Sequence, residues 1–152
     1  MKLSKIISGG QTGVDRAALD VALELGIPCG GWCPKGRLAE DGAIDVRYPL
    51  QETPSEEYVQ RTEWNVRDSD GTLILSWGKP TGGTAFTIAC AKKLHKPCLI
   101  FDLQKKVNRK RFTTWLQHHH IQILNIAGPR ESNAIGRIFK AASRVLLELI
   151  LG

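Results

Sequence analysis

Apolar runs alternate with helix-period patterns along the whole chain. The first run contains Ile6 and Ile7, and the pattern after it places apolar residues at i, i+3, i+4, i+7, i+8 and i+11 between Val14 and Leu25. This spacing puts the apolar residues on one face of a helix. Gly26 follows directly and predicts the end of this helix, because glycine readily adopts the left-handed conformation that terminates many helices.

Four further apolar runs predict strands, and four helix patterns lie between or after them. The strands are expected at residues 28–33, 71–77, 98–103 and 121–126, and the helices at residues 54–68, 84–95, 109–117 and 133–150. Thr53, Pro54 and Glu56 predict a capping box at the start of the helix at 54–68. Ser132 is the expected cap of the last helix, with Ile135 first on its apolar face. Residues 37–47 have no clear period and predict an irregular excursion.

This alternation of strands and helices predicts one α/β domain with a mostly parallel sheet, spanning residues 1–152. A chain of this length buries about 70% of its unfolded surface and can build a core without disulfides. The 42% apolar and 24% charged content is ordinary for a soluble globular protein. No apolar run approaches the roughly 18 residues of a membrane span, so no membrane partner is expected. The N-terminal segment lacks a secretory pattern, so the expected compartment is the cytoplasm.

Neither the cysteines nor the histidines show a strong metal-binding spacing. Cys29, Cys33, Cys90 and Cys98 are too few and too irregular for a disulfide framework, and we expect reduced thiols. Cys90 and Cys98 lie in apolar stretches and predict small core residues. Cys29 and Cys33 would share one face of an extended chain, which leaves a soft-ligand role open beside a structural one. The three histidines at 118–120 cannot all converge on one ion in an extended chain, so an exposed turn is favoured and no metal site is predicted.

The chain is basic, with a formal charge of +6, and residues 105–111 hold five basic residues and no acidic one. Excess positive charge favours anionic partners, although for this cluster alone a solvated loop and first helical turn is favoured over a functional role. No nucleic-acid-binding module is visible in the sequence. A phosphorylated small molecule is therefore a better candidate partner than a nucleic acid.

Three glycine-containing loops each follow a predicted strand and precede a predicted helix. The carboxyl ends of parallel strands meet at one edge of a sheet, so we expect these loops to converge there on an anionic ligand. Glycines at such turns leave no Cβ between the main chain and a ligand. The candidate binding residues in the loops are Gly9, Gly10, Gln11, Thr12, Gly13, Thr81, Gly82, Gly83, Thr84, Gly128, Arg130, Glu131 and Ser132.

Charged side chains beside these loops add candidate roles. Arg16 and Arg130 could give planar, bidentate donors to a phosphate, and Lys35 could act as a point charge at the same edge. Asp15 and Glu131 could hold a ligand hydroxyl or ring N–H group. For Asp15 an interaction with the dipole of its own helix is an equal alternative.

Four segments, residues 6–20, 31–42, 62–70 and 128–132, resemble the putative molybdenum carrier family. That family resembles a wider lysine-decarboxylase-like superfamily, which includes nucleotide-sensing proteins and the nucleotide phosphoribohydrolases known as "lonely guy". The resemblance implies a three-layer Rossmann-like fold and self-association into a dimer or tetramer. It also implies a pocket for the molybdenum cofactor, molybdopterin, which would be carried to an acceptor molybdoenzyme. Trp32, Trp64 and Trp77 are candidates for stacking on the pterin, beside a role in core packing.

An enzyme and a simple nucleotide-binding protein are the competing interpretations. The phosphoribohydrolases carry P-G-G-x-G-T-x-x-E, whereas this chain has Thr87 where that glutamate would stand. Loss of the acid removes general acid–base help worth about 100-fold to 10,000-fold. A carrier without catalytic residues is therefore favoured over hydrolysis of a nucleoside 5′-monophosphate, although Asp15 or Glu131 could substitute for the missing acid. If the ligand is not a pterin, a phosphate-bearing nucleotide is the alternative.

Overall fold

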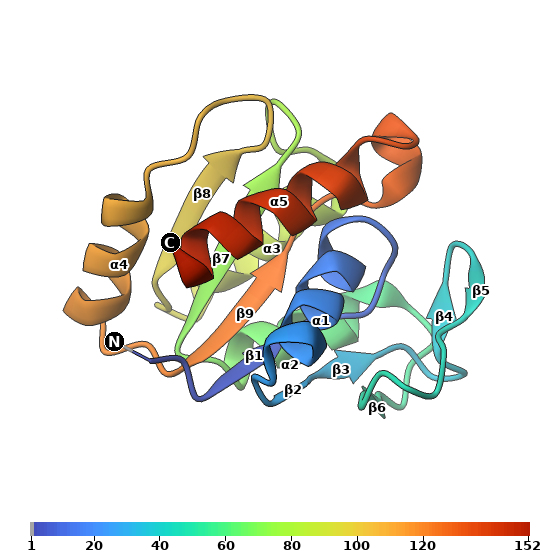
Figure 1. Cartoon of the computed structure of the whole chain (residues 1–152). Coiled ribbons are helices and arrows are strands. Elements are labelled where there is room, and N and C mark those ends of the chain that lie inside the picture. The colour runs from blue at the N-terminus through green and yellow to red at the C-terminus, as the bar shows by residue number, and fades with distance from the viewer. Residues whose placement is uncertain (1) are drawn as a thin grey trace.

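A parallel five-stranded sheet lies at the centre of the protein, in the order β2-β1-β9-β7-β8 (Figure 1). A computed structural model describes residues 2–152 of the chain. The strands of this sheet are β1 (Lys5–Ile7), β2 (Cys29–Gly30), β7 (Gly71–Ser76), β8 (Cys98–Asp102) and β9 (Ile123–Ala127). The chain leaves β1 toward one edge of the sheet and leaves β7 toward the other. The order therefore reverses next to β9, which is where open α/β sheets bind ligands.

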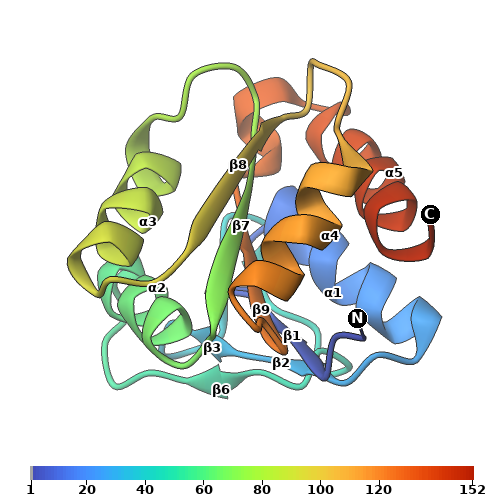
Figure 2. The ribbon, with the colours of Figure 1, turned by 90° about the vertical axis from the view of Figure 1, so that its left-hand side faces the viewer.

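Helices cover both faces of the sheet (Figure 2). One layer contains α1 (Val14–Leu25), α4 (Arg109–His118) and α5 (Ile138–Leu151), and the other contains α2 (Tyr58–Arg67) and α3 (Gly82–Lys93). This arrangement confirms the three-layer Rossmann-like fold. Helix α1 also ends as predicted, since Gly26 is left-handed at φ 69° and its N–H bonds back to the last turn.

The main core lies between the sheet and the layer of α1, α4 and α5. It contains fully buried side chains from β1, β7 and β9, such as Ile6, Leu73 and Ile126, and from α5, such as Leu146. Each such side chain contributes about 1.5 to 3 kcal/mol through removal from water. A smaller cluster of Val66, Cys90 and Ala91 joins α2 to α3 on the other face.

The run at 28–33 forms two strands instead of the one expected. Gly31 separates β2 from β3 (Trp32–Cys33), and β3 pairs with β6 (Gln51–Glu52) in a sheet of its own. Gly31 has φ 127°, and a Cβ there would lie 2.3 Å from the carbonyl oxygen of Ser8. The chain can turn away from the central sheet at this point because only glycine fits so close to β1.

The excursion at 37–50 is organised by one side chain. The guanidinium of Arg37 donates to the carbonyl oxygens of Ile44, Asp45, Tyr48 and Leu50 at 2.8 to 3.1 Å. A short hairpin of β4 (Leu38–Ala39) and β5 (Gly42–Ala43) projects from this segment. Four hydrogen bonds to one fixed cation order a segment that has no apolar period of its own.

Two predicted helix starts are wrong. Helix α2 begins at Tyr58, and the Thr53 hydroxyl donates to the Ser55 carbonyl instead of capping it. Ser132 lies within a short 3-10 turn, η1 (Glu131–Ala134), and α5 begins only at Ile138. Gly136 has φ 79° and separates η1 from α5. Ile135 is therefore 80% exposed and lies outside the apolar face of α5.

The cysteines and histidines lie where packing places them. Cys90 is buried and Cys98 packs against the same cluster, as predicted for core residues. Burial raises the pKa of the Cys98 thiol to about 11. The three histidines form an exposed turn at the end of α4. Within residues 2–152 we find neither a helix long and apolar enough to cross a membrane nor a group of three or more His, Cys, Asp or Glu side chains placed to hold a metal ion.

Candidate ligand-binding site

A cavity of about 580 Å³ lies at the carboxyl ends of β1, β7 and β9. All three glycine loops line it, the first through Gly9 and Gln11, the second through residues 81–84, and the third through residues 128–130 and Ser132. Helix α2 forms a further wall. The predicted convergence of these loops at one sheet edge is therefore what the fold produces, and it occurs where the strand order reverses.

The first and third loops are bonded to each other. The N–H of Val14 donates to the Pro129 carbonyl at 3.2 Å, and the N–H of Glu131 donates to the Thr12 hydroxyl at 3.1 Å. A Cβ on Gly13 would lie 2.4 Å from the Pro129 carbonyl oxygen. Gly13 and Thr12 thus hold two loops together, and neither lines the cavity.

The first loop uses several of its own N–H groups internally. The N–H of Gly10 donates to the Ser8 hydroxyl at 3.2 Å, and that of Thr12 donates to the Gln11 side chain at 3.0 Å. A Cβ on Gly10 would lie 2.5 Å from Leu50, so this glycine makes room for the excursion. Fewer main-chain donors are left for an anion here than the glycine pattern predicts.

What the first loop offers the cavity is the side chain of Gln11, which is 4% exposed. Its Oε1 accepts from the N–H groups of Thr12 and Glu40, at 3.0 and 2.8 Å. These two bonds fix the orientation of the Gln11 amide. Rotating the amide by 180° would place its NH₂ group against the N–H groups of Thr12 and Glu40. The Nε2 donor is thereby held in one orientation.

Asp15 and Arg61 form a buried ion pair in the cavity wall. Asp15 Oδ2 lies 3.0 Å from Arg61 Nη1, and the two side chains are 6% and 12% exposed. Burial raises the pKa of the Asp15 carboxyl above its ordinary value of 3.8, and Arg61 and the nearby N–H groups of Gln11 and Gly128 offset part of that rise. A Cβ on Gly9 would lie 1.6 Å from Arg61 Nη1, so Gly9 provides the space that the guanidinium occupies.

Three buried polar atoms in this wall have no hydrogen-bond partner among residues 2–152. They are Gln11 Nε2, Asp15 Oδ1 and Arg61 Nε. An unpaired buried polar group costs about 1 to 3 kcal/mol, so the three atoms together lower the stability of this wall.

The second loop presents free main-chain donors. The N–H groups of Gly82 and Gly83, at the start of α3, have no acceptor in the described part of the chain. Ideal Cβ atoms on these two glycines would have no atom within 4 Å, so packing does not require glycine there. Gly82 has φ 52°, whereas Gly83 has no such constraint. Helix α3 adds its dipole, with about half a positive charge at this end.

Arg130 adds a positive side chain from the third loop. Its guanidinium lies over the ring of Tyr58, 5.5 Å from the centroid, and Arg61 lies 5.1 Å from the same centroid. Arg130 forms no salt bridge within residues 2–152. Its charge is therefore available to an anion in the cavity.

Other predicted site residues lie outside the cavity. Arg16 donates to the Gly10 carbonyl at 3.1 Å and pairs with Asp41 at 3.0 Å. Lys35 is exposed and does not line the cavity. Glu131 accepts from the N–H groups of Gly136 and Phe139, both at 2.7 Å.

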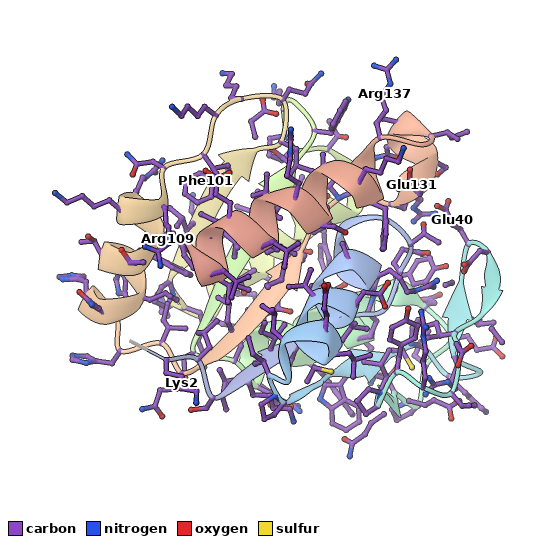
Figure 3. All side chains as sticks on the ribbon, viewed as in Figure 1. Lys2, Glu40, Phe101, Arg109, Glu131 and Arg137 are labelled. Atoms are coloured by element: carbon purple, nitrogen blue, oxygen red, sulfur yellow. The ribbon has the colours of Figure 1, made fainter. Side chains whose placement is uncertain are left out.

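Figure 3 shows Glu131 beside the start of α5, with Glu40 on the neighbouring hairpin. Glu40 accepts from the Ser132 N–H at 3.1 Å and from the Thr12 hydroxyl. Glu131 and Glu40 are thus used in fastening the loops, and this leaves Asp15 as the one carboxylate in the cavity lining within the described residues.

The tryptophans also lie elsewhere. Trp32 and Trp64 pack edge to face against each other at 4.7 Å, and Trp77 packs against the main core. The aromatic side chains in the cavity lining are Tyr58 and Phe86.

Helix α2 supplies functional candidates that sequence reasoning missed. Tyr58, Arg61, Thr62 and Asn65 line the cavity at i, i+3, i+4 and i+7, which is one polar face of the helix. That periodicity was visible in the sequence. Asn125 also lines the cavity, and its position as a polar residue inside an apolar strand was a second available signal.

Thr87 occupies the place of the phosphoribohydrolase glutamate. It is buried, and its hydroxyl donates to the Gly83 carbonyl at 2.9 Å, where it holds the first turn of α3. Thr87 lines the cavity but cannot act as an acid or base near neutral pH.

Comparison with known proteins identifies the family of the chain. Residues 6–150 match the model of the circularly permutated YpsA SLOG family. The chain belongs to that family. A solved structure at 1.45 Å resolution, the putative molybdenum carrier protein from Syntrophus aciditrophicus SB, is 52% identical, with a TM-score of 0.92 over 99% of this chain and 96% of that chain. The family resemblance found in the sequence is thereby confirmed. A comparison with curated proteins gives no match.

Proposed function

We propose that the protein binds the molybdenum cofactor, a phosphorylated pterin, in the cavity at the sheet edge and carries it without chemical turnover. One observation carries the proposal. Within residues 2–152 the N–H groups of Gly82 and Gly83 have no acceptor, and these residues line the same cavity as Arg130, whose guanidinium forms no salt bridge. The name of the similar solved protein supports a molybdenum-related cargo.

The cofactor's phosphate would lie at the start of α3. The two unbonded N–H groups and the helix dipole favour an anion there, and Arg130 adds a charge-assisted donor from the third loop. The charged side chains in the lining are Asp15, Arg61 and Arg130. With the first two paired, the cavity keeps one positive charge for a dianionic phosphate.

The size and chemistry of the lining also fit such a cargo. A volume of about 580 Å³ lies within the range of roughly 300 to 1,000 Å³ that is usual for small-molecule and cofactor sites. No cysteine or histidine belongs to the described lining. Molybdenum would keep the dithiolene sulfurs of its own cofactor, and the protein would supply contacts to the organic part and shelter it from water and oxygen.

A nucleotide would use the same phosphate contacts, but hydrolysis has less support because Thr87 replaces the glutamate and Asp15 is paired with Arg61. The carrier proposal includes self-association and hand-over to an acceptor molybdoenzyme in the cytoplasm. These parts are supported by the family resemblance alone.

The test is to identify what the purified full chain carries. The protein is produced in cells that make the cofactor, isolated without oxygen, and analysed by native mass spectrometry, elemental analysis for molybdenum and fluorescence of the oxidised pterin. We expect molybdenum and pterin at a fixed ratio to the chain. A bound nucleotide without molybdenum, or release of free base from nucleoside 5′-monophosphates, would contradict the carrier function.

A further inference from the structure

We propose that the open edge of β8, with the basic residues around it, binds an extended acidic segment of a partner protein, which adds to the sheet as a further strand. β8 lies at the end of the strand order and pairs with β7 on one side. Figure 2 looks toward this edge and shows β8 with α3 on one side and α4 on the other. The surface lies apart from the cavity, so the proposal goes beyond the proposed function.

The main chain of β8 presents unused hydrogen-bonding groups along this edge. In a parallel ladder, successive residues direct their N–H and C=O groups to opposite sides of the strand. The Pro97 carbonyl accepts from the Thr72 N–H at 2.9 Å, and the Leu103 N–H donates to the Ser76 carbonyl at 2.7 Å. The odd-numbered residues therefore face β7. The N–H and C=O groups of Ile100 face the open side, where nothing within residues 2–152 bonds to them.

The strand itself carries none of the usual obstacles to a further strand. Natural sheets block open edges with bulges, with proline, or with charged residues on the edge strand. β8 pairs with β7 in continuous register from residue 98 to residue 102, without a bulge. Residues 99–101 are apolar, and Ile100 is 38% exposed although it lies in the middle of the strand. This edge can therefore accept an extended chain by β-augmentation.

The charge around the edge indicates the chemistry of the partner. Residues 92–111 run from the end of α3 through β8 into the first turn of α4, and they contain eight Lys or Arg and one acidic residue, Asp102. The rest of the chain contains thirteen basic and fourteen acidic residues, so the net charge of +6 arises in this segment. Seven of the eight basic residues are exposed, and none of the eight forms a salt bridge within the described chain. Unpaired exposed cations of this density attract an acidic partner.

A groove beside the strand provides room for acidic side chains. It has a volume of about 640 Å³ and lies between α4 and the start of β8, with Lys110 and Arg111 in its lining. No acidic residue belongs to the described lining, and no residue is shared with the lining of the cavity. The Arg111 guanidinium lies 5.7 Å from the ring centroid of Phe101, so this cation is held over the strand. Alternate side chains of an added strand would point to this face of the sheet.

Two other occupants fit these observations less well. A second copy of the chain, paired through its own β8, would bring two strongly basic segments together, and like charges opposite each other are destabilising. A nucleic acid could contact the cations through its phosphates, but a phosphate has no donor for the Ile100 carbonyl. An acidic peptide satisfies both the cations and the main-chain groups.

The test selects short random peptides displayed on phage against the full chain. We expect the binders to be rich in Asp and Glu, with apolar residues at alternate positions. Their affinities are measured by fluorescence anisotropy and should fall as salt rises, because salt screens exposed charges. Amide hydrogen exchange of Ile100, followed by NMR, should slow when a selected peptide binds, since its N–H becomes bonded to the added strand.

Two variants assign the binding to this surface. Ile100→Pro removes the outward N–H group but no bond to β7, whereas Ile100→Val keeps both and should bind normally. Lys110→Glu combined with Arg111→Glu reverses two charges in the groove. Each disruptive variant is expected to weaken binding about tenfold or more. Lys140→Glu combined with Arg144→Glu reverses two exposed charges on α5 outside the groove and should have little effect. Thermal unfolding establishes which variants are folded, and the charge reversal and the exchange of Ile100 decide the proposal without the proline variant.

Binders without an excess of acidic residues, unchanged exchange at Ile100, or equal losses in the groove and α5 charge variants would overturn the proposal. So would a single-stranded DNA that binds more tightly than every selected peptide, or self-association that Ile100→Pro abolishes in sedimentation. The proposed function fails separately. A chain that carries neither molybdenum nor pterin but binds acidic peptides refutes the carrier role alone, and a loaded chain that selects no acidic peptide refutes the docking edge alone.

Discussion

Asp15 and Arg61 form a buried ion pair, with 3.0 Å between Oδ2 and Nη1, although 46 residues separate them in the chain. The pair joins the first turn of α1 to the middle of α2, and thus connects the two helical layers across the edge of the sheet. Both members are buried and line the cavity. The pair therefore supports both the fold and the cavity wall.

Removing one member should destabilise the protein more than removing both. Arg61→Met leaves an uncompensated buried carboxylate and should lower the free energy of unfolding by about 3 kcal/mol. In the double variant Asp15→Asn with Arg61→Met, most of that loss should be recovered, because no buried charge remains. Urea unfolding of the four proteins in this cycle gives the coupling directly.

The matched control is the Arg67–Asp68 pair on the same helix, whose side chains are 51% and 41% exposed. Exposed pairs contribute about 0 to 1 kcal/mol, so Arg67→Met should change stability little. An equal loss at both pairs would show that burial does not set the strength of the Asp15–Arg61 interaction.

Gly83→Ala should abolish cargo binding without harming the fold. A Cβ at Gly83 meets no protein atom within 4 Å, and the residue needs no positive φ. Alanine is favoured over glycine in helices by about 1 kcal/mol, so unfolding should occur at the same or higher urea concentration. The added methyl would lie where the phosphate approaches the Gly82 and Gly83 N–H groups. Pterin content after purification measures the loss, and full retention would remove the start of α3 from the site.

Arg130→Ala should weaken affinity by about 1.5 to 3 kcal/mol, or roughly 10-fold to 150-fold, through loss of a charge-assisted contact. Arg137→Ala is the matched control, because Arg137 lies outside the cavity lining and points away from the body of the protein in Figure 3. Both variants lose one positive charge from the same segment. If titration gave equal losses, general electrostatic attraction would explain binding and Arg130 would hold no specific contact.

The fold followed from the sequence because its periodicities are local. Residues 14–25 repeat apolar positions with helical spacing, and Gly26 ends the helix through its own conformational preference. Because the strands are parallel, all three glycine loops lie at one edge of the sheet, whatever the exact residue at which each turn ends. The start of α2 could not be predicted in this way, because the N–H and the hydroxyl of Thr53 both donate to the carbonyl of Cys33, 20 residues earlier.

The content of the site depended on long-range packing. Gly10 and Gly13 have the residue type of a phosphate loop, yet Leu50 and the Pro129 carbonyl fill the space that their missing Cβ atoms leave. Glu131 looked like a ligand contact, but its carboxylate accepts from the N–H groups of Gly136 and Phe139, which lie just before and within the first turn of α5. Arg61 was missed because a polar helix face gives no indication of whether it meets solvent or a cavity.

The basic segment at 105–111 gives a test of where anions bind. Lys105, Lys106 and Lys110 lie outside the cavity lining, so their simultaneous replacement by alanine should leave cargo affinity unchanged at physiological salt. Screening reduces interactions between exposed charges more than about 8 Å apart under these conditions. Titration of the triple variant beside the natural protein checks this, and loss of binding would place the anion site on the segment itself.

Asp102 gives a test of how the second loop is held. Its Oδ1 accepts from the N–H groups of Gln104 and Gly78, at 2.9 and 3.1 Å, and these bonds lower the pKa of the Asp102 carboxyl below its ordinary value of 3.8. A depressed folded-state pKa means that the stabilisation is complete above the unfolded value and is lost as pH falls through the folded one. Asp102→Asn keeps an acceptor oxygen but cannot titrate. The difference in unfolding free energy between the natural protein and this variant should therefore be constant from pH 5 to pH 7 and should shrink below about pH 4. Urea unfolding at a series of pH values measures it, and a difference that grows toward acid would reverse the assigned sign.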